Sequence, residues 1–587
     1  MNPRSSAFFQ RTEGRCLDPD LATGPQIVDL PQIKIFGLTR PTSLPSKQEM
    51  FWAKKVAREA IAQAEKTSHA LVTVRAGASP SGPKHIGNMN DQVRAHFIRM
   101  SIDALNRKSR FVLTTDDMDP LRSIPARIPN CAGDWQELGE EAKRSLRSEL
   151  GKPVSSVHDP FDCHISYSEH FTSLMMADLY ALEVRPELFH VSRMYREGLY
   201  YDFMFETMSK VKQIREVLRK FQTRIPADWV PLTPVCANCG KLNAKVLSID
   251  LESRQVEYEC VTRTLHGKYE VKGCGYRAHG DMRNAKLPWR FEWVADWKIF
   301  LTDAEPFGKD HYEGSWKSGR VLAKEIYGFE PPVPLVYEFF LVDGEKMASR
   351  LGNVYTISDM LKLVEPEVVR YMYVKKPLVQ RDIAVKNVDR LVLEFDEIER
   401  LAFEEKGERA DEAKIYYSYC GNLEAEKPPI RIPYQLAASM VQFYQPRVAL
   451  ERLVMGGLVS PSLTDQEKAS AIKRLVLASN WVRMFPERRT KPIEDGEILE
   501  ESPQVVKAFA KLRDEYSREE PEGERLQALL YKVAKEYGIA PSEFFKVGYR
   551  LFLGSESGPR LGNFLATLDK DVVFRKLGQV KERKANH

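Results

Sequence analysis

Two short segments, far apart in the chain, carry side chains that are suited to ATP chemistry. Residues 79–88 read Ser-Pro-Ser-Gly-Pro-Lys-His-Ile-Gly-Asn, and residues 346–350 read Lys-Met-Ala-Ser-Arg. The small residues of the first segment let a phosphate approach the backbone, and His85 and Asn88 can donate hydrogen bonds to it. The second segment adds two cations and a hydroxyl group, which are the groups needed to hold a departing pyrophosphate.

The residues on both sides of the first segment predict the elements that position it. Residues 70–74 form an apolar run rich in β-formers, and the residues after the turn have apolar side chains at nearly helical spacing. This pattern predicts a strand, a turn and a helix, with His85 at the N-terminus of the helix. Free backbone N–H groups and the helix dipole favour bound phosphate at that position.

A second predicted strand, residues 111–115, leads into the acidic residues 116–119, which read Asp-Asp-Met-Asp. Polar side chains at the carboxyl end of a strand lie where doubly wound sheets bind their ligands. Residues 333–342 are predicted to return to the same sheet after a long insertion. The sequence therefore predicts an α/β fold with a Rossmann-type catalytic domain.

The two segments resemble the HIGH and KMSKS motifs of class I aminoacyl-tRNA synthetases. Asn88 stands where that class usually has a second histidine, and an asparagine there is typical of the class I lysyl-tRNA synthetases. The resemblance runs from about residue 51 to 580 and includes residues 289–293, 305–311, 327–332, 337–338, 480–482 and 554–561. The chain departs from the family pattern at Arg350, where Lys or Ser is usual, at Asp296, often an arginine, and at Glu292, often an aspartate.

The resemblance implies an ATP-dependent ligation of L-lysine to tRNA(Lys) through a lysyl-adenylate, with Mg²⁺ accompanying ATP. It implies that the catalytic residues are His85, Asn88, Lys346 and Ser349. The implied ATP-binding residues are Pro80, His85, Gly87, Asn88, Gly308, Asp310, Lys346 and Met347, and the implied lysine-binding residues are Gly77, Ser79, Trp289, His311 and Tyr337. Gly308 would let adenosine approach the backbone, and Asp310 could accept hydrogen bonds from its ribose.

A pocket for lysine must hold a flexible four-carbon stem and two ammonium groups. Aromatic rings pack against such a stem and attract a cation, which makes Trp289, Trp293 and Tyr337 natural lining residues. Each of them could equally belong to an ordinary core. The possible anionic partners of the ammonium groups are Asp116, Asp117, Glu292 and Glu338, and the sequence does not choose among them.

Four cysteines within the predicted insertion have the composition of a zinc ribbon. Cys236 and Cys239 have CxxC spacing, and Cys260 and Cys274 follow. Turns in zinc ribbons present four thiolates to a tetrahedral ion. His279 competes for one of the last two positions, and buried free cysteines without a metal are the alternative.

A second cluster in the insertion combines a carboxylate, a thiolate and two imidazoles within twelve residues. By spacing alone it is a weak candidate, because His and Asp are also common in loops and caps. The resemblance implies that Asp159, Cys163, His164 and His170 are the ligands of a second zinc ion. Both Zn²⁺ ions would be structural, since protein side chains fill each shell and leave no open position for a reacting water.

The composition is typical of a large protein with several domains and reduced thiols. The chain has 587 residues, 43% of them hydrophobic, and a formal net charge of only +5, so any contact with tRNA must come from local basic surface. No apolar run is long enough for a membrane span, and eight cysteines, four of them grouped, favour metal sites over disulfides. We expect a cytoplasmic protein without membrane contact, and the sequence leaves its oligomeric state open.

The predicted domain order combines these parts. Residues 1–48 form an N-terminal extension, partly disordered, for which a targeting role is the alternative. The further predicted segments are 49–130, the first Rossmann half; 131–284, the zinc-bearing insertion; 285–345, the second Rossmann half; 346–400, the KMSKS loop and stem-contact region; and 401–587, an α-helical anticodon-binding domain.

The helical C-terminal part contains aromatic and basic residues close together in the sequence: Trp481, Arg483, Arg488, Arg489 and Lys491. Such side chains can stack on splayed bases and contact phosphates, although a solvated basic face with a core tryptophan is equally compatible. Three other functions compete with the lysine-specific one. They are a glutamyl- or glutaminyl-tRNA synthetase, a nucleotidyltransferase with a similar turn, and a noncatalytic tRNA-binding paralogue.

Overall fold

The computed structural model describes residues 51–583, apart from 222–224, 266–268, 343, 348–353, 405–406, 490 and 519–521. The chain forms two compact units. The first runs to Thr356 and takes in Lys376–Asp382, and the second holds Ile357–Lys375 and the chain from Ile383 onward. The predicted extension, residues 1–48, and Ser349 and Arg350 of the second motif lie outside the described residues.

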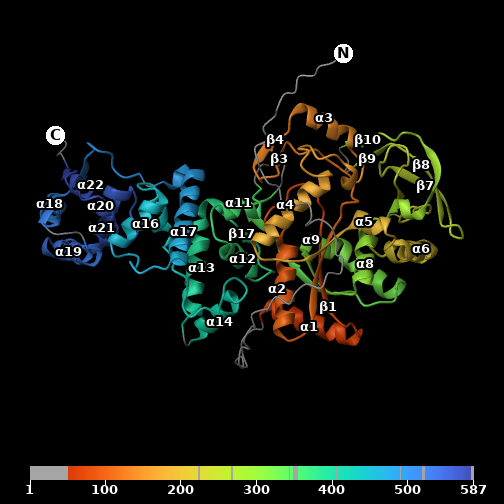
Figure 1. Ribbon diagram of the computed structural model, residues 1–587, viewed down its shortest axis with the longest axis horizontal. Coiled ribbons are helices and arrows are strands. Elements are labelled where there is room, and N and C mark those ends of the chain that lie inside the picture. The colour runs from red at the N-terminus through yellow and green to blue at the C-terminus, as the bar shows by residue number, and fades with distance from the viewer. Residues whose placement is uncertain are drawn as a thin grey trace, which may run out of the picture. The chain divides into compact units, whose positions relative to one another are not determined.

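A parallel five-stranded sheet forms the centre of the first unit (Figure 1). Its strand order is β14-β13-β1-β2-β5. The strands are β1 (Val72–Ala78), β2 (Ser109–Thr115), β5 (Glu187–His190), β13 (Thr302–Gly308) and β14 (Val333–Tyr337). In chain order β1 comes first and pairs with β2 on one side and β13 on the other, so the winding direction reverses between β1 and β13. A sheet with this topology binds ligands beside the reversal, at the carboxyl ends of its strands.

Burial on both faces explains why β1 and β2 are readable from the sequence. Six of the seven residues of β1 are buried, and the last five of β2 are buried. Strands covered on both faces have nearly continuous apolar runs. The helices α1 (Trp52–Lys66) and α2 (Asn90–Ala104) pack against each other and against the sheet, and α8 (Trp289–Phe300) packs against β13.

Two features of the sheet differ from the sequence-based expectation. The edge strand β5 lies within residues that the sequence assigned to the insertion, and it pairs in parallel with β2. Of the predicted return strand, β14 joins the sheet, whereas β15 (Phe340–Val342) forms a separate small sheet with β16 (Glu345–Lys346) and β17 (Arg381–Asp382). A four-residue edge strand is too short to show a period, and its partner is distant in sequence.

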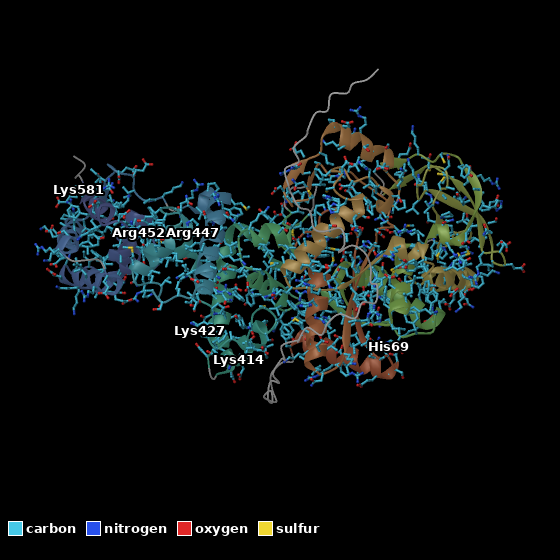
Figure 2. All side chains as sticks on the ribbon, in the orientation of Figure 1. His69, Lys414, Lys427, Arg447, Arg452 and Lys581 are labelled. Carbon is cyan, nitrogen blue, oxygen red and sulfur yellow. The ribbon has the colours of Figure 1, made fainter. Side chains whose placement is uncertain are left out.

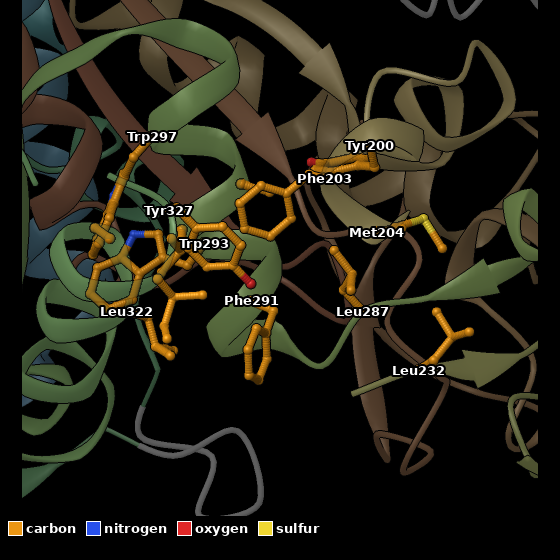
Figure 3. Close-up of a cluster of buried hydrophobic side chains, with 14 of the residues drawn as sticks. Tyr200, Phe203, Met204, Leu232, Leu287, Phe291, Trp293, Trp297, Leu322 and Tyr327 are labelled. Carbon is orange, nitrogen blue, oxygen red and sulfur yellow. The ribbon is translucent and has the colours of Figure 1, made fainter. Parts of the chain in front are cut away.

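A large aromatic cluster forms the main core of the first unit (Figure 3). It includes Trp293, Trp297, Phe291 and Tyr200. The Trp293 and Trp297 ring centroids lie 5.0 Å apart, and the Trp297 side chain is 1% exposed. Because α8 supplies three of these rings, the core fixes the helix that also borders the candidate site.

The region between β2 and α8 contains small sheets and short helices. Its helices are α3 (Glu140–Glu149), α4 (Tyr167–Ala181), α5 (Val191–Arg196), α6 (Tyr201–Ser209) and α7 (Val211–Arg219). Its further strands are β3 (Arg127–Pro129), β4 (Trp135–Glu137), β6 (Thr233–Pro234), β7 (Ala244–Asp250), β8 (Gln255–Cys260), β9 (Arg263–Leu265), β10 (Tyr269–Val271), β11 (Arg277–Asp281) and β12 (Ala285–Lys286). β11, β8 and β7 form an antiparallel sheet.

The second unit is mainly helical. Its helices are α11 (Ile357–Leu361), α12 (Pro366–Val374), α13 (Val388–Ala402), α14 (Glu408–Tyr417), α15 (Tyr434–Met440), α16 (Pro446–Met455), α17 (Asp465–Met484), α18 (Pro503–Arg518), α19 (Gly523–Glu536), α20 (Pro541–Leu553), α21 (Leu561–Thr567) and α22 (Lys570–Leu577). The strands β18 (Leu499–Glu501) and β19 (Val580–Glu582) pair in parallel. α17 begins with a capping box between Thr464 and Glu467, which explains its sharp start.

Trp481, considered from the sequence as a possible RNA contact, lies in the interior of the helical unit. Trp481 is 4% exposed, donates its indole N–H to the Lys386 carbonyl at 3.2 Å, and meets Tyr434 edge-on. A ring enclosed in this way cannot stack on a base, so Trp481 is a core residue. Arg483 and Arg489 are exposed. Within the described part of the chain, no helix is long and apolar enough to cross a membrane.

Candidate active site

A cavity of about 490 Å³ opens at the carboxyl edge of the parallel sheet. Its walls come from the ends of β1, β2, β13 and β14, from α8 and from the segment that contains β16. The structure brings together on these walls most of the residues that the sequence selected: Gly77, Ser79, His85, Gly87, Asn88, Trp289, Asp310, His311, Tyr337, Lys346 and Met347. Pro80 and Gly308 are buried next to lining residues and do not line the cavity themselves.

The turn after β1 holds His85 beside the cavity, although not at the start of a helix. The His85 carbonyl accepts the Asn88 and Met89 amides at 2.8 and 3.2 Å, and α2 begins only at Asn90. The turn uses these amides before the helix starts, which corrects the expected position. The Ile86 amide donates to the Tyr355 carbonyl at 2.8 Å and ties the turn to a later segment.

The His85 imidazole is neutral at pH 7. Burial, followed by the charges of the nearby Lys84 and Lys346, lowers its pKa to about 4. A neutral imidazole can donate one hydrogen bond but adds no positive charge. Positive charge for phosphate binding on this wall must therefore come from other side chains, of which Lys84, Arg122 and Lys346 line the cavity.

Two glycines leave room for neighbouring side chains at the site. A Cβ atom at Gly87 would lie 2.8 Å from the Met347 methyl carbon, and one at Gly308 would lie 2.7 Å from Asp310 Oδ1. Both distances are shorter than carbon contacts in packed proteins, so a larger residue would displace these neighbours. Gly308 thus acts through Asp310, which does line the cavity.

The acidic residues after β2 point in different directions. Asp116 and Asp119 line the cavity and are 8% and 9% exposed. Burial, followed by the Asp119 charge, raises the pKa of Asp116 to about 7. Asp117 faces away, because it accepts hydrogen bonds from the Ser192 amide at 2.6 Å and the Ser192 hydroxyl at 2.5 Å.

The other two acidic candidates are engaged outside the cavity wall. Glu292 forms a buried ion pair with Lys286 at 2.7 Å, and Glu338 pairs with Lys309 at 2.7 Å. Among the four carboxylates that the sequence left open, only Asp116 faces the cavity. Asp119 lies on the cavity wall together with Asp116. Asp119 was not among the lysine partners proposed from the sequence, although it belongs to the same acidic run, residues 116–119.

Sequence reasoning missed a further carboxylate on the wall. Asp91 lines the cavity and accepts the Tyr337 hydroxyl at 2.5 Å. Burial raises the pKa of Asp91 to about 7. This contact fixes the tyrosine ring that the sequence assigned to the lysine pocket, and it is visible only in the fold, because the two residues are far apart in the sequence.

Aromatic rings form another wall of the cavity. Trp289 stacks on Trp293 with ring centroids 4.8 Å apart, and His311 lies 4.9 Å from Trp289. Trp293 is 4% exposed and also belongs to the main core. Trp293 therefore lines the cavity and belongs to a core cluster at the same time, while its contact with lysine stays a prediction.

A buried polar network supports the aromatic wall. The Trp293 indole donates to Glu305 at 2.8 Å, and Glu305 also accepts the Arg75 guanidinium at 2.5 Å. A second guanidinium nitrogen of Arg75 donates to Asp296. The same nitrogen also donates to the Thr114 hydroxyl at 2.6 Å. Asp296, which departs from the family pattern, therefore serves as a counter-ion of Arg75.

The four cysteines of the predicted zinc ribbon converge. The Cys236 and Cys274 sulfurs lie 3.6 Å apart, the Cys239 and Cys260 sulfurs lie 3.7 Å apart, and all four lie within 4.8 Å of one another. Ligands at about 2.3 Å from a tetrahedral zinc ion are separated by about 3.8 Å, so the group fits such an ion. His279 is not part of this group among the described residues.

The second cluster also fits a tetrahedral ion. The Cys163 sulfur lies 3.1 Å from His164 Nδ1, 3.3 Å from His170 Nδ1 and 3.2 Å from Asp159 Oδ2. His170 Nε2 is 2.9 Å from the Pro129 carbonyl, which accepts its proton and leaves Nδ1 as the ligand atom. A carbonyl behind a histidine is typical of the outer shell of metal sites.

Known proteins resemble the chain over most of its length. Residues 50–421 match the family model described as tRNA synthetases class I (K). A "Lysine--tRNA ligase" of Haloarcula marismortui is 36% identical over 90% of this chain and 96% of that protein. A "Lysine--tRNA ligase" of Methanocaldococcus jannaschii is 30% identical over 90% of this chain and 99% of that protein.

A solved structure of a glutamate tRNA ligase from Elizabethkingia meningosepticum aligns with 87% of this chain and 99% of that chain, at 12% identity and a TM-score of 0.38. So loose a likeness carries no argument about function. The match of the family model to more than half of the chain, together with relatives that span it, identifies the protein as a member of the class I tRNA synthetases, in the family described as class I (K).

Proposed function

We propose that the protein ligates L-lysine to tRNA(Lys) with ATP, through a lysyl-adenylate. The observation that carries this proposal is the composition of one cavity, in which a phosphate-binding turn, Lys346, buried carboxylates and an aromatic wall meet. The relatives that span the chain carry the name lysine–tRNA ligase, which supports the same substrates.

The reaction has two steps. A carboxylate oxygen of lysine attacks the α-phosphorus of ATP, the bond to the bridging oxygen breaks, and pyrophosphate leaves with the electron pair. A terminal ribose hydroxyl of the tRNA then attacks the carbonyl carbon, loses its proton, and releases AMP. The protein positions the reactants and stabilises charge on the phosphates.

The residues around the cavity divide these tasks. His85 and Asn88 donate hydrogen bonds to the phosphates, Lys346 follows the pyrophosphate, and Ser349 of the same motif is assigned to that step by the resemblance. Gly308 and Asp310 hold adenosine, with Pro80, Gly87 and Met347 shaping its place. Mg²⁺ accompanies ATP and is held chiefly by phosphate oxygens.

The pocket chemistry favours lysine over acidic or neutral amino acids. The stem of lysine can lie along Trp289 and Trp293, and its ammonium groups are attracted by Asp116 and Asp119. The side chain of glutamate would meet these carboxylates with a like charge, and glutamine would offer only its α-ammonium where lysine offers two cations. Gly77, Ser79, His311 and Tyr337 complete the proposed lysine site.

The remaining parts of the proposal concern metal and tRNA. Two structural Zn²⁺ ions would hold the four-cysteine group and the cluster from Asp159 to His170, because each group supplies four ligands. The second unit would bind the anticodon within residues 401–587. Exposed basic side chains such as Lys427 and Arg447 project from this unit (Figure 2). A synthetase with free thiols fits the cytoplasm.

Exchange of labelled pyrophosphate into ATP, measured with each amino acid in turn, tests the function. We expect exchange only with lysine and Mg²⁺. Equal exchange with glutamate or glutamine would reject the lysine assignment. Absence of exchange with every amino acid, in a protein that binds tRNA, would favour a noncatalytic role, and transfer of AMP to another acceptor would favour a nucleotidyltransferase.

A further inference from the structure

Lys84, the residue before His85, is a cation on the cavity wall that the proposed mechanism does not use. Its side chain is half-buried and lines the cavity. Within the described ranges of the chain, no hydrogen bond or ion pair within 4 Å joins it to another residue. It differs in this respect from Arg122 on the same wall, which pairs with Asp119 at 3.2 Å.

The surroundings of Lys84 contain charges of both signs. Burial lowers its pKa below the ordinary value, while Asp116, Asp91 and Asp119 counteract that effect. Lys346 lies on the same cavity wall. A poorly solvated ammonium without a direct partner is costly, so its retention at a ligand site points to a partner that arrives from solution.

The charges of lysine and ATP indicate which of these two substrates is the partner of Lys84. Lysine has two ammonium groups, which Lys84 repels, and a single carboxylate. ATP has a triphosphate, and His85, the neighbouring hydrogen-bond donor, is neutral at pH 7 because its pKa is about 4. The turn therefore needs a cation for the triphosphate, and Lys84 is the lysine side chain that the turn itself supplies.

We propose that Lys84 is a further catalytic residue, which contacts the triphosphate of bound ATP and stabilises the negative charge that develops there as the adenylate forms. The proposal rests on ATP being the substrate, as in the proposed function. Lys84 keeps its proton and forms no covalent bond. The ammonium stabilises the phosphate oxygens while the lysine carboxylate bonds to the α-phosphorus and the electron pair leaves with pyrophosphate.

The test compares ATP with adenosine in the full-length protein. Lys84→Met keeps most of the length of the unbranched side chain and removes its charge. We expect Lys84→Met to weaken binding of ATP about 10-fold and to leave binding of adenosine unchanged, because only ATP carries the triphosphate. The kcat of lysine-dependent exchange should fall about 100-fold, with an unchanged KM for lysine, and Lys84→Arg should restore part of the loss of ATP binding.

The opposite role for Lys84 is an internal counter-ion of the acidic wall. In that case Lys84→Met would bind ATP like the wild type and show a lower KM for lysine, and the proposal would be overturned. Lys324→Met is the matched control, because Lys324 pairs with Glu330 at 2.7 Å and does not line the cavity. It should change none of these quantities.

Two measurements separate a failure of this proposal from other failures. Unchanged adenosine binding and an unchanged melting temperature show that Lys84→Met is folded. A wild-type protein that binds ATP but shows no lysine-dependent exchange would reject the proposed function, while the comparison of ATP with adenosine would still decide the role of Lys84. Equal loss of ATP and adenosine in both Lys84 variants would overturn the proposal.

Discussion

At the scale of single residues, the candidate site combines neutral hydrogen-bond donors with separate cations. His85 is neutral because it is buried near Lys84 and Lys346, so donation and charge come from different side chains. Lys346 is exposed, and its ammonium lies 3.8 Å from the centre of the Phe339 ring. An exposed cation at the end of a short strand can follow a leaving group, whereas a buried imidazole stays in place.

Removing either group should slow amino-acid activation without unfolding the protein. For His85→Ala and Lys346→Ala we expect lysine-dependent pyrophosphate exchange to slow by about 2–4 kcal/mol in barrier, the range for one positioned charge-stabilising donor. The melting temperature should remain within a few degrees, since neither side chain belongs to a core cluster. Unchanged exchange rates in both variants would reject these roles.

The raised pKa of Asp116 predicts a dependence on pH near neutrality. Its carboxyl is protonated below a pKa of about 7 and charged above it, so attraction for an ammonium appears as the pH rises. We expect kcat/KM for lysine to rise between about pH 6 and 8. Asp116→Asn should bind lysine more weakly and lose much of this rise. A profile of the same shape in both proteins would exclude Asp116 as a lysine partner.

The same pKa shift has a consequence for stability in the absence of ligands. A carboxyl whose pKa is raised on folding favours the folded state at low pH, and that contribution is lost as the pH rises from about 4 to 7. As the pH rises over this interval, the free energy of unfolding of Asp116→Asn should therefore increase relative to that of the wild type. Asp91→Asn serves as a comparison, because Asp91 has a similar pKa but also accepts the Tyr337 hydroxyl.

At the scale of elements, the segment that carries the four cysteines has a small core of its own. Among the residues that the structure describes, Ala244 and Tyr258 are the buried apolar residues that cluster with cysteines of this group. Such a small core contributes little, and a bound ion would contribute directly to folding of the segment. The second cluster joins the loop at Asp159 to the start of α4.

Native mass spectrometry should therefore find two zinc ions per chain. Cys236→Ser should lose one ion and Cys163→Ser the other, each with a lower melting temperature, because metal binding is coupled to local folding. Cys420→Ser is the control, since this buried cysteine belongs to neither cluster, and it should keep both ions. A wild-type stoichiometry of zero would reject both sites, and a stoichiometry of one would reject one of them.

At the scale of the whole molecule, the two units are connected by a chain that passes between them more than once. Residues 376–382 return to the first unit, where β17 pairs with β15, before the chain continues into α13. A truncation after residue 356 would remove β17, and one near residue 390 would leave α12 without α13 and α14, the helices on which it packs. Surface substitutions in the full chain are therefore the better test of the helical unit.

Replacing Arg488 and Arg489 together by alanine should weaken binding of tRNA(Lys) and flatten its dependence on salt, because fewer counterions are released. Pyrophosphate exchange should remain unchanged. The matched control replaces Arg400 and Arg409, whose charges are already compensated by ion pairs with Glu397 at 2.8 and 3.7 Å. The same loss of tRNA binding in both double variants would show that net charge, and not a local contact, is responsible.

The sequence by itself determined the features that depend on neighbours along the chain. The strand and turn before α2 and the CxxC pair are each contained in a short segment, so residue type and spacing identify them. The cluster from Asp159 to His170 is equally short, but spacing alone made it a weak candidate and the resemblance implied its ligand set. Family membership was also readable and is confirmed, because many separate motifs occur in one order. The individual site roles and the domain boundaries stay predictions.

The tertiary structure alone decided which side chains face the cavity. Asp116 and Asp117 are adjacent in sequence, yet one lines the cavity and the other caps the segment at Ser192. Asp91 meets Tyr337 only because the fold brings the first turn of α2 to the end of β14, and Trp481 is held by contacts with Lys386 and Tyr434. Local sequence fixes the period of an element, whereas the direction of a side chain depends on packing partners hundreds of residues away.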